Sequence, residues 1–323
     1  MGNPPVDKIV RRLADPHRIS PAPTFRCGPL RSQMGRDGYM RAVAQAIEYI
    51  RAGDVYQVNL AHELTGRFEG STRAAYAALR RAARPAMGAY FAWDENDRRR
   101  AVLSASPEMF LTLTPDGRVS TRPMKGTRPG RTPEHELRDA EKDRAELNMI
   151  IDLMRNDLGR VCRFGSVRVD EPRSIERHGG DDTGVLQATG TVSGVLRPDA
   201  SLGDLLRATF PAGSVTGAPK IRAMQIIDEL EDSPRGVYCG AIGVVSDCGH
   251  AQFSVAIRTA VVEGSVGDAE RGAGSAAADV IADGRLSYRV GAGIVADSDP
   301  RAEWEETMVK AGAVRALAEI DER

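Results

Sequence analysis

Lysine is scarce in this sequence, and one lysine stands where covalent chemistry could occur. Only five of the 44 basic residues are lysine, and the other 39 are arginine. An amine can lose its proton and attack carbon, whereas a guanidinium remains charged. We interpret Lys8 and Lys142 as solvated surface residues, as most charged side chains are. Lys125 ends a strand-like run and precedes a Gly126-Thr127 turn, so we treat it as a candidate nucleophile.

A carboxyl group is predicted to lie across from this lysine. Residues 108–114 and 118–124 read as strands around Asp116-Gly117, and Asp-Gly is a strong hairpin signal. A two-residue loop would place Glu108 opposite Lys125 with their Cβ atoms ~5 Å apart, whereas a three-residue loop would shift the register by one. The two residues could form an exposed ion pair worth less than ~1 kcal/mol, or an acid beside a nucleophile.

A second carboxylate falls on the apolar side of a predicted helix. Residues 134–158 have the helical period, and Glu146 lies one turn before the buried position Ile150. A desolvated carboxylate must be paired or bound to a cation, because burying it alone is costly. The alternative is that Glu146 stands at the edge of the apolar stripe and reaches water.

Two more carboxylates and a lysine share one face of the last predicted helix. Over residues 302–320, Glu303, Glu306, Lys310 and Leu317 recur at helical spacing. This face could form the rim of a site, or Glu306 and Lys310 could be an ordinary surface pair at i,i+4.

The segment over residues 210–220 is rich in Gly, Ser and Thr and leads into an amphipathic helix. Pro219 suits the first helical turn. Backbone N–H groups at such a helix start can bind an anion, and Lys220 would add a positive charge. The spacing is not that of a P-loop.

The remaining pattern predicts the elements that must position these residues. Antiparallel hairpins predominate, which favours a single α+β domain over residues 36–320. Residues 1–35 contain six prolines and are predicted to form an irregular arm. Along the strand at 55–68, Gln57 and Asn59 share one face. Helices are predicted at 37–52 and 72–84, further strands at 87–93, 101–106, within 159–204, and at 236–246, 251–262 and 287–296, and a long hairpin loop at 264–284.

Composition argues against several other classes of protein. The formal charge of −1 gives no electrostatic signature for nucleic acid or an anionic membrane. No apolar stretch approaches the ~20 residues that span a bilayer, and the first residues lack a signal-peptide pattern. The four cysteines show no CxxC spacing and the five histidines are scattered, so no disulfide framework or zinc site is indicated. We therefore expect a cytoplasmic protein without nucleic-acid or membrane partners.

Several motifs of this sequence occur together in one known family. They are Lys125-Gly-Thr-Arg-Pro, Asp143-Arg-Ala-Glu146, Asp152-Leu-Met-Arg-Asn-Asp157, residues 210–231, Gly236-Val-Tyr238-Cys-Gly-Ala-Ile-Gly243, Ile257-Arg258-Thr, Gly291-Ala-Gly-Ile-Val-Ala-Asp297 and Glu303-x-x-Glu306-x-x-x-Lys310. With these motifs the sequence resembles the chorismate-utilising enzymes over about residues 36–318. The resemblance implies one α/β/β/α layered domain with two large antiparallel sheets, which binds chorismate and Mg²⁺.

Two positions sort the reactions of this family. A lysine at Lys125 is typical of the branch that makes 4-amino-4-deoxychorismate, where it acts as a nucleophile, whereas anthranilate synthases usually carry alanine. Gln57 stands where isochorismate and salicylate synthases carry a lysine that activates water. Many members also have a histidine that our alignment places at Leu186. The resemblance therefore favours 4-amination, with anthranilate formation as the second choice and a weakly active chorismate-binding subunit as the third.

The resemblance also implies a role for each site residue. Glu108 would be the general acid and Lys125 the nucleophile. Glu146 and Glu306 would hold Mg²⁺, with Glu303 behind them. Ammonia would come from a separate glutamine amidotransferase subunit. The residues implied to contact chorismate are Gly126, Thr127, Tyr238, Arg258, Gly291, Ala292, Gly293 and Lys310, and the helix start at Lys220 is the further anion site proposed above.

Overall fold

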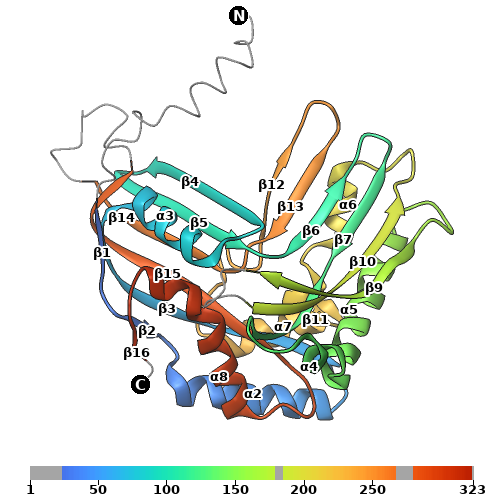
Figure 1. Cartoon of the computed structure of the whole chain (residues 1–323), viewed down its shortest axis with the longest axis horizontal. Helices are drawn as coiled ribbons and strands as arrows, with labels where there is room; N and C mark the ends of the chain where they lie inside the picture. Colours follow the sequence, from blue (N-terminus) through green and yellow to red (C-terminus); the bar gives the residue numbers. More distant parts are fainter. Residues whose placement is uncertain (1–23, 179–184, 267–278, 322–323) are drawn as a thin grey trace, which may run out of the picture.

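The fold is built on two sheets, antiparallel except for the parallel pairing of β16 (Ile320–Asp321) with β2 (Leu30–Ser32), with helices on their outer faces (Figure 1). The computed structural model describes residues 24–178, 185–266 and 279–321. This arrangement confirms the predicted α+β class with two large antiparallel sheets. None of the helices in the described ranges is both long and apolar enough to cross a membrane.

The first sheet is organised around its two longest strands. β3 (Gln57–Ser71) and β15 (Val280–Ile294) pair along almost their whole length. The helices α2 (Gly35–Arg51), α3 (Thr72–Ala83) and α8 (Pro300–Lys310) pack on one face and bury its apolar core. The other strands are β1 (Phe25–Cys27), β2 (Leu30–Ser32), β4 (Met87–Glu95), β5 (Arg98–Ser106), β11 (Gly217–Ala218), β14 (Thr259–Ser265) and β16 (Ile320–Asp321).

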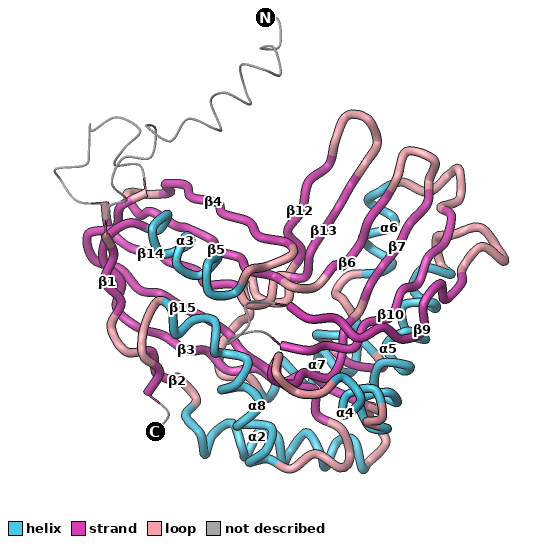
Figure 2. The backbone as a smooth tube through the Cα atoms, in the orientation of Figure 1, coloured by secondary structure: helices cyan, strands magenta, loops and turns pink. Residues whose placement is uncertain are grey.

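The second sheet is covered on its outer face mainly by α5 (Glu141–Gly159), as Figure 2 shows. The predicted stripe of this helix is confirmed, because Leu147, Ile150 and Leu158 are all fully buried. The other elements are the strands β6 (Met109–Leu113), β7 (Arg118–Arg122), β8 (Met124–Pro129), β9 (Arg168–His178), β10 (Val185–Val195), β12 (Ala241–Val245) and β13 (Ala251–Val255), and the helices α4 (Glu134–Arg138), α6 (Leu202–Thr209) and α7 (Lys220–Leu230), the last of which packs on β3.

The chain passes between the two sheets twice at the same place. Residues 106–109 lead from β5 to β6, and residues 255–259 lead from β13 to β14. The two passages are hydrogen-bonded to each other: Val255 N–H donates to the Glu108 carbonyl at 3.1 Å, and Ala105 N–H donates to the Arg258 carbonyl at 3.0 Å. The strand predicted over 251–262 is therefore broken, because Arg258 takes a left-handed φ of 50° there.

Four other expectations need correction. Residues 25–27 and 30–32 are strands that pair with β3, not part of an irregular arm, while residues 1–23 lie outside the described ranges. The helix predicted over 134–158 is interrupted at residues 139–140. The last helix ends at Lys310 and continues as the 3-10 turn η4 (Ala311–Ala316), where Gly312 disfavours an α-helix. The loop predicted over 264–284 is shorter on its C-terminal side, because β15 begins at Val280, and residues 267–278 are not described.

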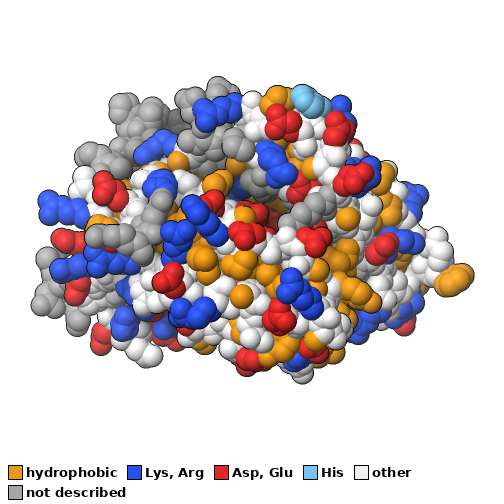
Figure 3. Space-filling view, turned by 90° about the horizontal axis from the view of Figure 1, so that it is seen from below, with side chains coloured by type: hydrophobic (Ala, Val, Ile, Leu, Met, Phe, Trp, Pro, Cys, Tyr) orange, Lys and Arg blue, Asp and Glu red, His pale blue; other side chains and the backbone are white. Residues whose placement is uncertain are grey.

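Charged side chains of both signs are interspersed with hydrophobic ones on the face drawn in Figure 3. This mixture agrees with the formal charge of −1 for the whole sequence.

Candidate active site

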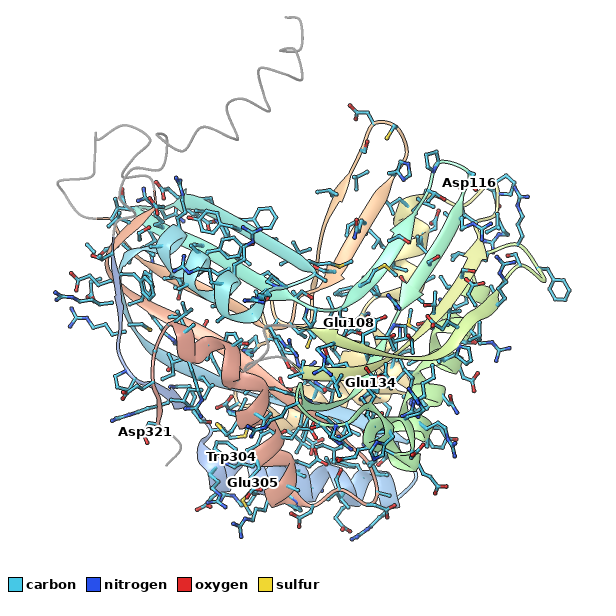
Figure 4. All side chains as sticks on the ribbon, viewed as in Figure 1. Glu108, Asp116, Glu134, Trp304, Glu305 and Asp321 are labelled. Atoms are coloured by element: carbon cyan, nitrogen blue, oxygen red, sulfur yellow. The ribbon has the colours of Figure 1, made fainter. Side chains whose placement is uncertain are left out.

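A cavity of about 280 Å³ lies where the two sheets meet. Figure 4 shows Glu108 at this junction, on the passage from β5 to β6. The cavity volume is near the lower end of the range for small-molecule sites, roughly 300 Å³. Of the residues predicted to act on a substrate or metal, those lining it are Glu108, Lys125, Gly126, Glu146, Tyr238, Arg258, Gly291, Gly293, Glu303, Glu306 and Lys310.

Lys125 enters the cavity from β8 next to a β-bulge. In the pairing of β8 with β10, Thr127 lies opposite Gln187 and Lys125 opposite Ala188, so Gly126 is the extra residue. Gly126 has a φ of 70°, and a Cβ there would lie 2.8 Å from Leu137, so a side chain is excluded. Bulges of this kind re-aim neighbouring side chains and are frequent beside active sites.

The Lys125 amine is nearly enclosed. Its side chain is 11% exposed, and Nζ lies 3.6 Å from Oε2 of Glu146. Burial lowers the pKa of Lys125 and the charge of Lys310 lowers it further, while the nearby carboxylates act in the opposite direction. A Cβ at Gly293 would lie 2.6 Å from Nζ, so the chain brings a glycine against this amine.

The predicted pairing of Glu108 with Lys125 is wrong in its register. Leu113 lies opposite Val119 and, after an irregularity, Met109 lies opposite Arg122. The loop therefore has three residues, and Lys125 pairs with Ala188 of β10. The two residues nevertheless line the same cavity, because β7 ends opposite Met109, next to Glu108, and β8 begins there with Met124 and Lys125.

Glu108 is a buried acid that is hydrogen-bonded by the Ser214 side chain and by the backbone of Met124. Its side chain is 3% exposed, and the hydroxyl of Ser214 donates a hydrogen bond to Oε1. Burial raises the pKa of Glu108 to about 7, although Ser214 and the charge of Lys125 favour the carboxylate. A carboxyl group with this pKa is partly protonated near neutrality, as a general acid requires.

The three predicted metal-binding carboxylates lie at the edge of the same cavity. Glu303 is buried and accepts a hydrogen bond from Ser298 at 2.6 Å, while Glu306 pairs with Lys310 at 2.6 Å. Lys310 also donates to the carbonyl of Gly291 at 3.0 Å. Within the described ranges, no three acidic, histidine or cysteine side chains converge closely enough to form a metal cluster. Mg²⁺ often uses only one or two carboxylates together with substrate oxygens and water, so this donor set fits it.

The cavity is also lined by a guanidinium and a phenol, those of Arg258 and Tyr238. Burial lowers the pKa of Arg258, whose guanidinium has no ion-pair partner among the residues that the structure describes. Tyr238 is buried, and burial raises its pKa well above the usual value. A partly buried guanidinium without a carboxylate partner is suited to a substrate carboxylate.

Two of the predicted contacts do not line the cavity, and a third falls outside the described side chains. Lys220 pairs with Asp157 at 2.6 Å and donates to the carbonyl of Thr209 at 2.6 Å, and it does not line the cavity. Ala292 alternates with Gly291 and Gly293 along β15 and is buried in the core of the first sheet. The backbone of Thr127 belongs to β8, but its side chain lies outside the described part of the structure.

Sequence reasoning missed several cavity residues. Leu186, where our alignment placed the family histidine, is buried in the core of the second sheet, whereas its neighbour Gln187 faces the cavity. Side chains alternate between the two faces of a strand. If Leu186 faces the core, the polar residue beside it must face the other way, so Gln187 could have been predicted to face the cavity. Asn59 faces the cavity as the alternation of β3 predicted, while no periodic signal marked Ser214 or Tyr288.

The fold matches that of solved chorismate-utilising enzymes. Anthranilate synthase component I from Streptococcus pneumoniae superposes with a TM-score of 0.71 at 29% identity, over 97% of this chain and 65% of that chain. MenF, the menaquinone-specific isochorismate synthase from Escherichia coli, superposes with a TM-score of 0.73 at 22% identity, over 96% and 67%, and supports the fold alone.

The sequence assigns the family. Residues 5–316 match the family described as chorismate binding enzyme, and the chain belongs to it.

Curated relatives carry two different names at similar identity. Aminodeoxychorismate synthase from Streptomyces griseus is 41% identical over 310 residues, which are 94% of this chain and 39% of that protein. Anthranilate synthase component 1 from Aquifex aeolicus is 41% identical over 299 residues, or 90% and 55%. Aminodeoxychorismate synthase component 1 from Escherichia coli is 38% identical over 291 residues, or 88% and 58%. The chain thus spans between about two fifths and three fifths of the length of these relatives.

Proposed function

We propose that this chain aminates chorismate to 4-amino-4-deoxychorismate, the reaction of aminodeoxychorismate synthase component I. The observation that carries the proposal is the buried Lys125 amine, which shares one small cavity with the buried acid Glu108. A desolvated lysine with a lowered pKa is an activated nucleophile. Relatives with this name support the choice without deciding it, because anthranilate synthases are equally similar.

The residues of the cavity would divide the reaction into two displacements. The neutral amine of Lys125 attacks C2 of chorismate, the C1–C2 and C5–C6 double bonds shift to C1–C6 and C4–C5, and the 4-hydroxyl leaves as water with the proton of Glu108. Ammonia then attacks C4, both double bonds shift back, and the C2–N bond to Lys125 breaks. The new ammonium group returns a proton to Glu108. The amine of Lys125 is thereby regenerated. Arg258 and Lys310 would hold the substrate carboxylates during both steps.

Glu146 and Glu306 would hold Mg²⁺, with Glu303 behind them. When bound, the ion would withdraw negative charge from the ring carboxylate as a Lewis acid. All three side chains line the cavity that contains Lys125. The Glu146 carboxylate also faces the nucleophile at 3.6 Å.

We infer that ammonia reaches this chain from a separate glutamine amidotransferase subunit in the cytoplasm. Several relatives are named as component 1 of their synthase, which supports a second component.

One assay separates this proposal from its alternatives. The purified chain is incubated with chorismate, Mg²⁺ and ammonium, with and without an aminodeoxychorismate lyase. p-Aminobenzoate that appears only with the lyase supports the proposal. Fluorescent anthranilate without the lyase would instead assign the second function, for which the Aquifex aeolicus relative is the argument. Chorismate binding without turnover would assign a non-catalytic chorismate-binding subunit.

A further inference from the structure

One buried ion pair outside the cavity spans the ends of the segment that carries Ser214. The segment of residues 210–219 links α6 to α7. Lys220, which follows it, donates to the carbonyl of Thr209, which precedes it, and the same amine lies 2.6 Å from Oδ2 of Asp157. The Lys220 and Asp157 side chains are only 13% and 4% exposed. One amine therefore fixes both ends of the segment to the last turns of α5.

Within the segment, Ser214 is hydrogen-bonded to the candidate general acid, Glu108. Residues 213–215 form a 3-10 turn, and the Ser214 side chain is buried with its hydroxyl donating to Oε1 of Glu108. Thr216 closes the same turn through a hydrogen bond to the Ala212 carbonyl at 2.9 Å.

We propose that the Asp157–Lys220 pair is a positioning device for the acid: it holds the segment so that the Ser214 hydroxyl stays on Glu108. This inference rests on the proposed function, in which Glu108 is the acid. Lys220 would act through Ser214 and not by contact with substrate, which departs from the anion-binding role that the sequence suggested.

The proposal predicts how the acidity of Glu108 depends on each residue. A hydrogen bond donated to a carboxylate stabilises its charged form, so its loss should raise the pKa of Glu108. The other charged or titratable groups facing Glu108 are Lys125 from β8, Lys310 from α8, Arg258 from the passage between the sheets, and the thiol of Cys239. None of these would be changed by substitutions at Asp157, Lys220 or Ser214.

The test is an infrared titration of the Glu108 carboxyl group in the full chain without substrate, with Glu108→Gln identifying its band. Ser214→Ala should raise the pKa of Glu108 by about one unit, the size expected for one charge-assisted hydrogen bond. The double variant Asp157→Asn/Lys220→Met, which leaves no unpaired buried charge, should shift it in the same direction. Lys220→Arg should restore a value near that of the parent. Combining the double variant with Ser214→Ala should add no further shift, because both changes remove the same hydrogen bond.

The proposal would be overturned if the double variant folds and Glu108 keeps the pKa it has in the parent. It would also be overturned if the pKa shift of Glu108 in the double variant adds fully to the shift caused by Ser214→Ala. The matched control is Asp94→Asn/Arg99→Met, which removes another ion pair with a buried arginine, in the β4–β5 hairpin of the first sheet. This control should lower thermal stability without moving the pKa of Glu108. Since the titration needs no turnover, its failure is distinguishable from the absence of an aminated product.

Discussion

The Lys125 amine lies 3.6 Å from the Glu146 carboxylate, so the candidate nucleophile and a candidate metal ligand are direct neighbours. Neither side chain is more than 15% exposed. A substitution at either residue is therefore expected to change the electrostatic surroundings of the other. Variants that separate their roles are accordingly the most informative.

Lys125→Ala should abolish formation of 4-amino-4-deoxychorismate, by about 10³-fold or more, as expected for loss of a nucleophile. The product is followed through the lyase-coupled assay, together with anthranilate fluorescence, because an alanine here is typical of anthranilate synthases. Lys125→Arg is the matched control, since it keeps a positive charge that cannot attack carbon. An alanine variant with the parent rate and product would rule out a covalent step.

Glu146→Gln should eliminate Mg²⁺-dependent turnover while the protein remains folded. The measurement is the initial rate across an Mg²⁺ titration. Glu305→Gln is the control, because Glu305 is 59% exposed on α8 and pairs only with Arg301 among the contacts described. An unchanged Mg²⁺ dependence in the Glu146 variant would exclude it as a ligand.

The rate should fall as the pH rises above about 7, because Glu108 must carry a proton to act as an acid and its pKa is raised to about 7. Glu108→Gln should be slower by about 100-fold or more and should lack this alkaline limb. The pH profile of kcat/KM for both proteins tests this. Persistence of the same limb in the variant would assign it to another group.

Stability should also respond to the ionisation of Glu108. Its pKa is raised in the folded state relative to about 4.5, so its contribution is fully present below pH 4.5 and is lost as the pH rises through about 7. The loss amounts to up to about 3 kcal/mol. Glu108→Gln should therefore gain stability relative to the parent between pH 5 and pH 8 when Tm is measured at each pH. A difference in Tm that does not change with pH would contradict the buried acid.

Gly293→Ala should reduce turnover on the order of 100-fold, because displacing reacting groups by about 1 Å has that effect. The new Cβ would lie 2.6 Å from Lys125 Nζ and 2.9 Å from Gln57 Nε2. Gly312→Ala is the control, since no atom lies within 4 Å of the Cβ it would gain. Both variants are compared by steady-state rate and thermal melting. Equal rates in the two variants would show that the approach of Gly293 to the amine is unimportant.

Helices and strands with a clear hydrophobic period could be predicted from the sequence. Strand pairings that contain bulges or irregularities could not. The stripe of α5 and the alternation of Gln57 and Asn59 on β3 were predictable from spacing alone. The strand register around Glu108 and Lys125 was not predictable, because an irregularity between Met109 and Thr112 and the bulge at Gly126 leave no periodic signal.

Two further predictions that were made from residue types were wrong. Lys220 follows a glycine-rich lead-in typical of anion sites, but a carboxylate on another helix takes its charge. The strand over 251–262 has continuous apolar alternation, but its middle must cross between sheets, and a single left-handed residue decides this. The partner of Lys220 and the crossing at Arg258 both depend on residues far away in the sequence, and a local sequence pattern does not reveal them.

The double passage between the sheets has a mechanical consequence. Glu108 and Arg258 stand on adjacent crossings that are hydrogen-bonded to each other. The backbone therefore ties the acid and the guanidinium together directly, although they lie far apart in the sequence. A substitution that weakens these two hydrogen bonds is expected to change the separation between the acid and the guanidinium.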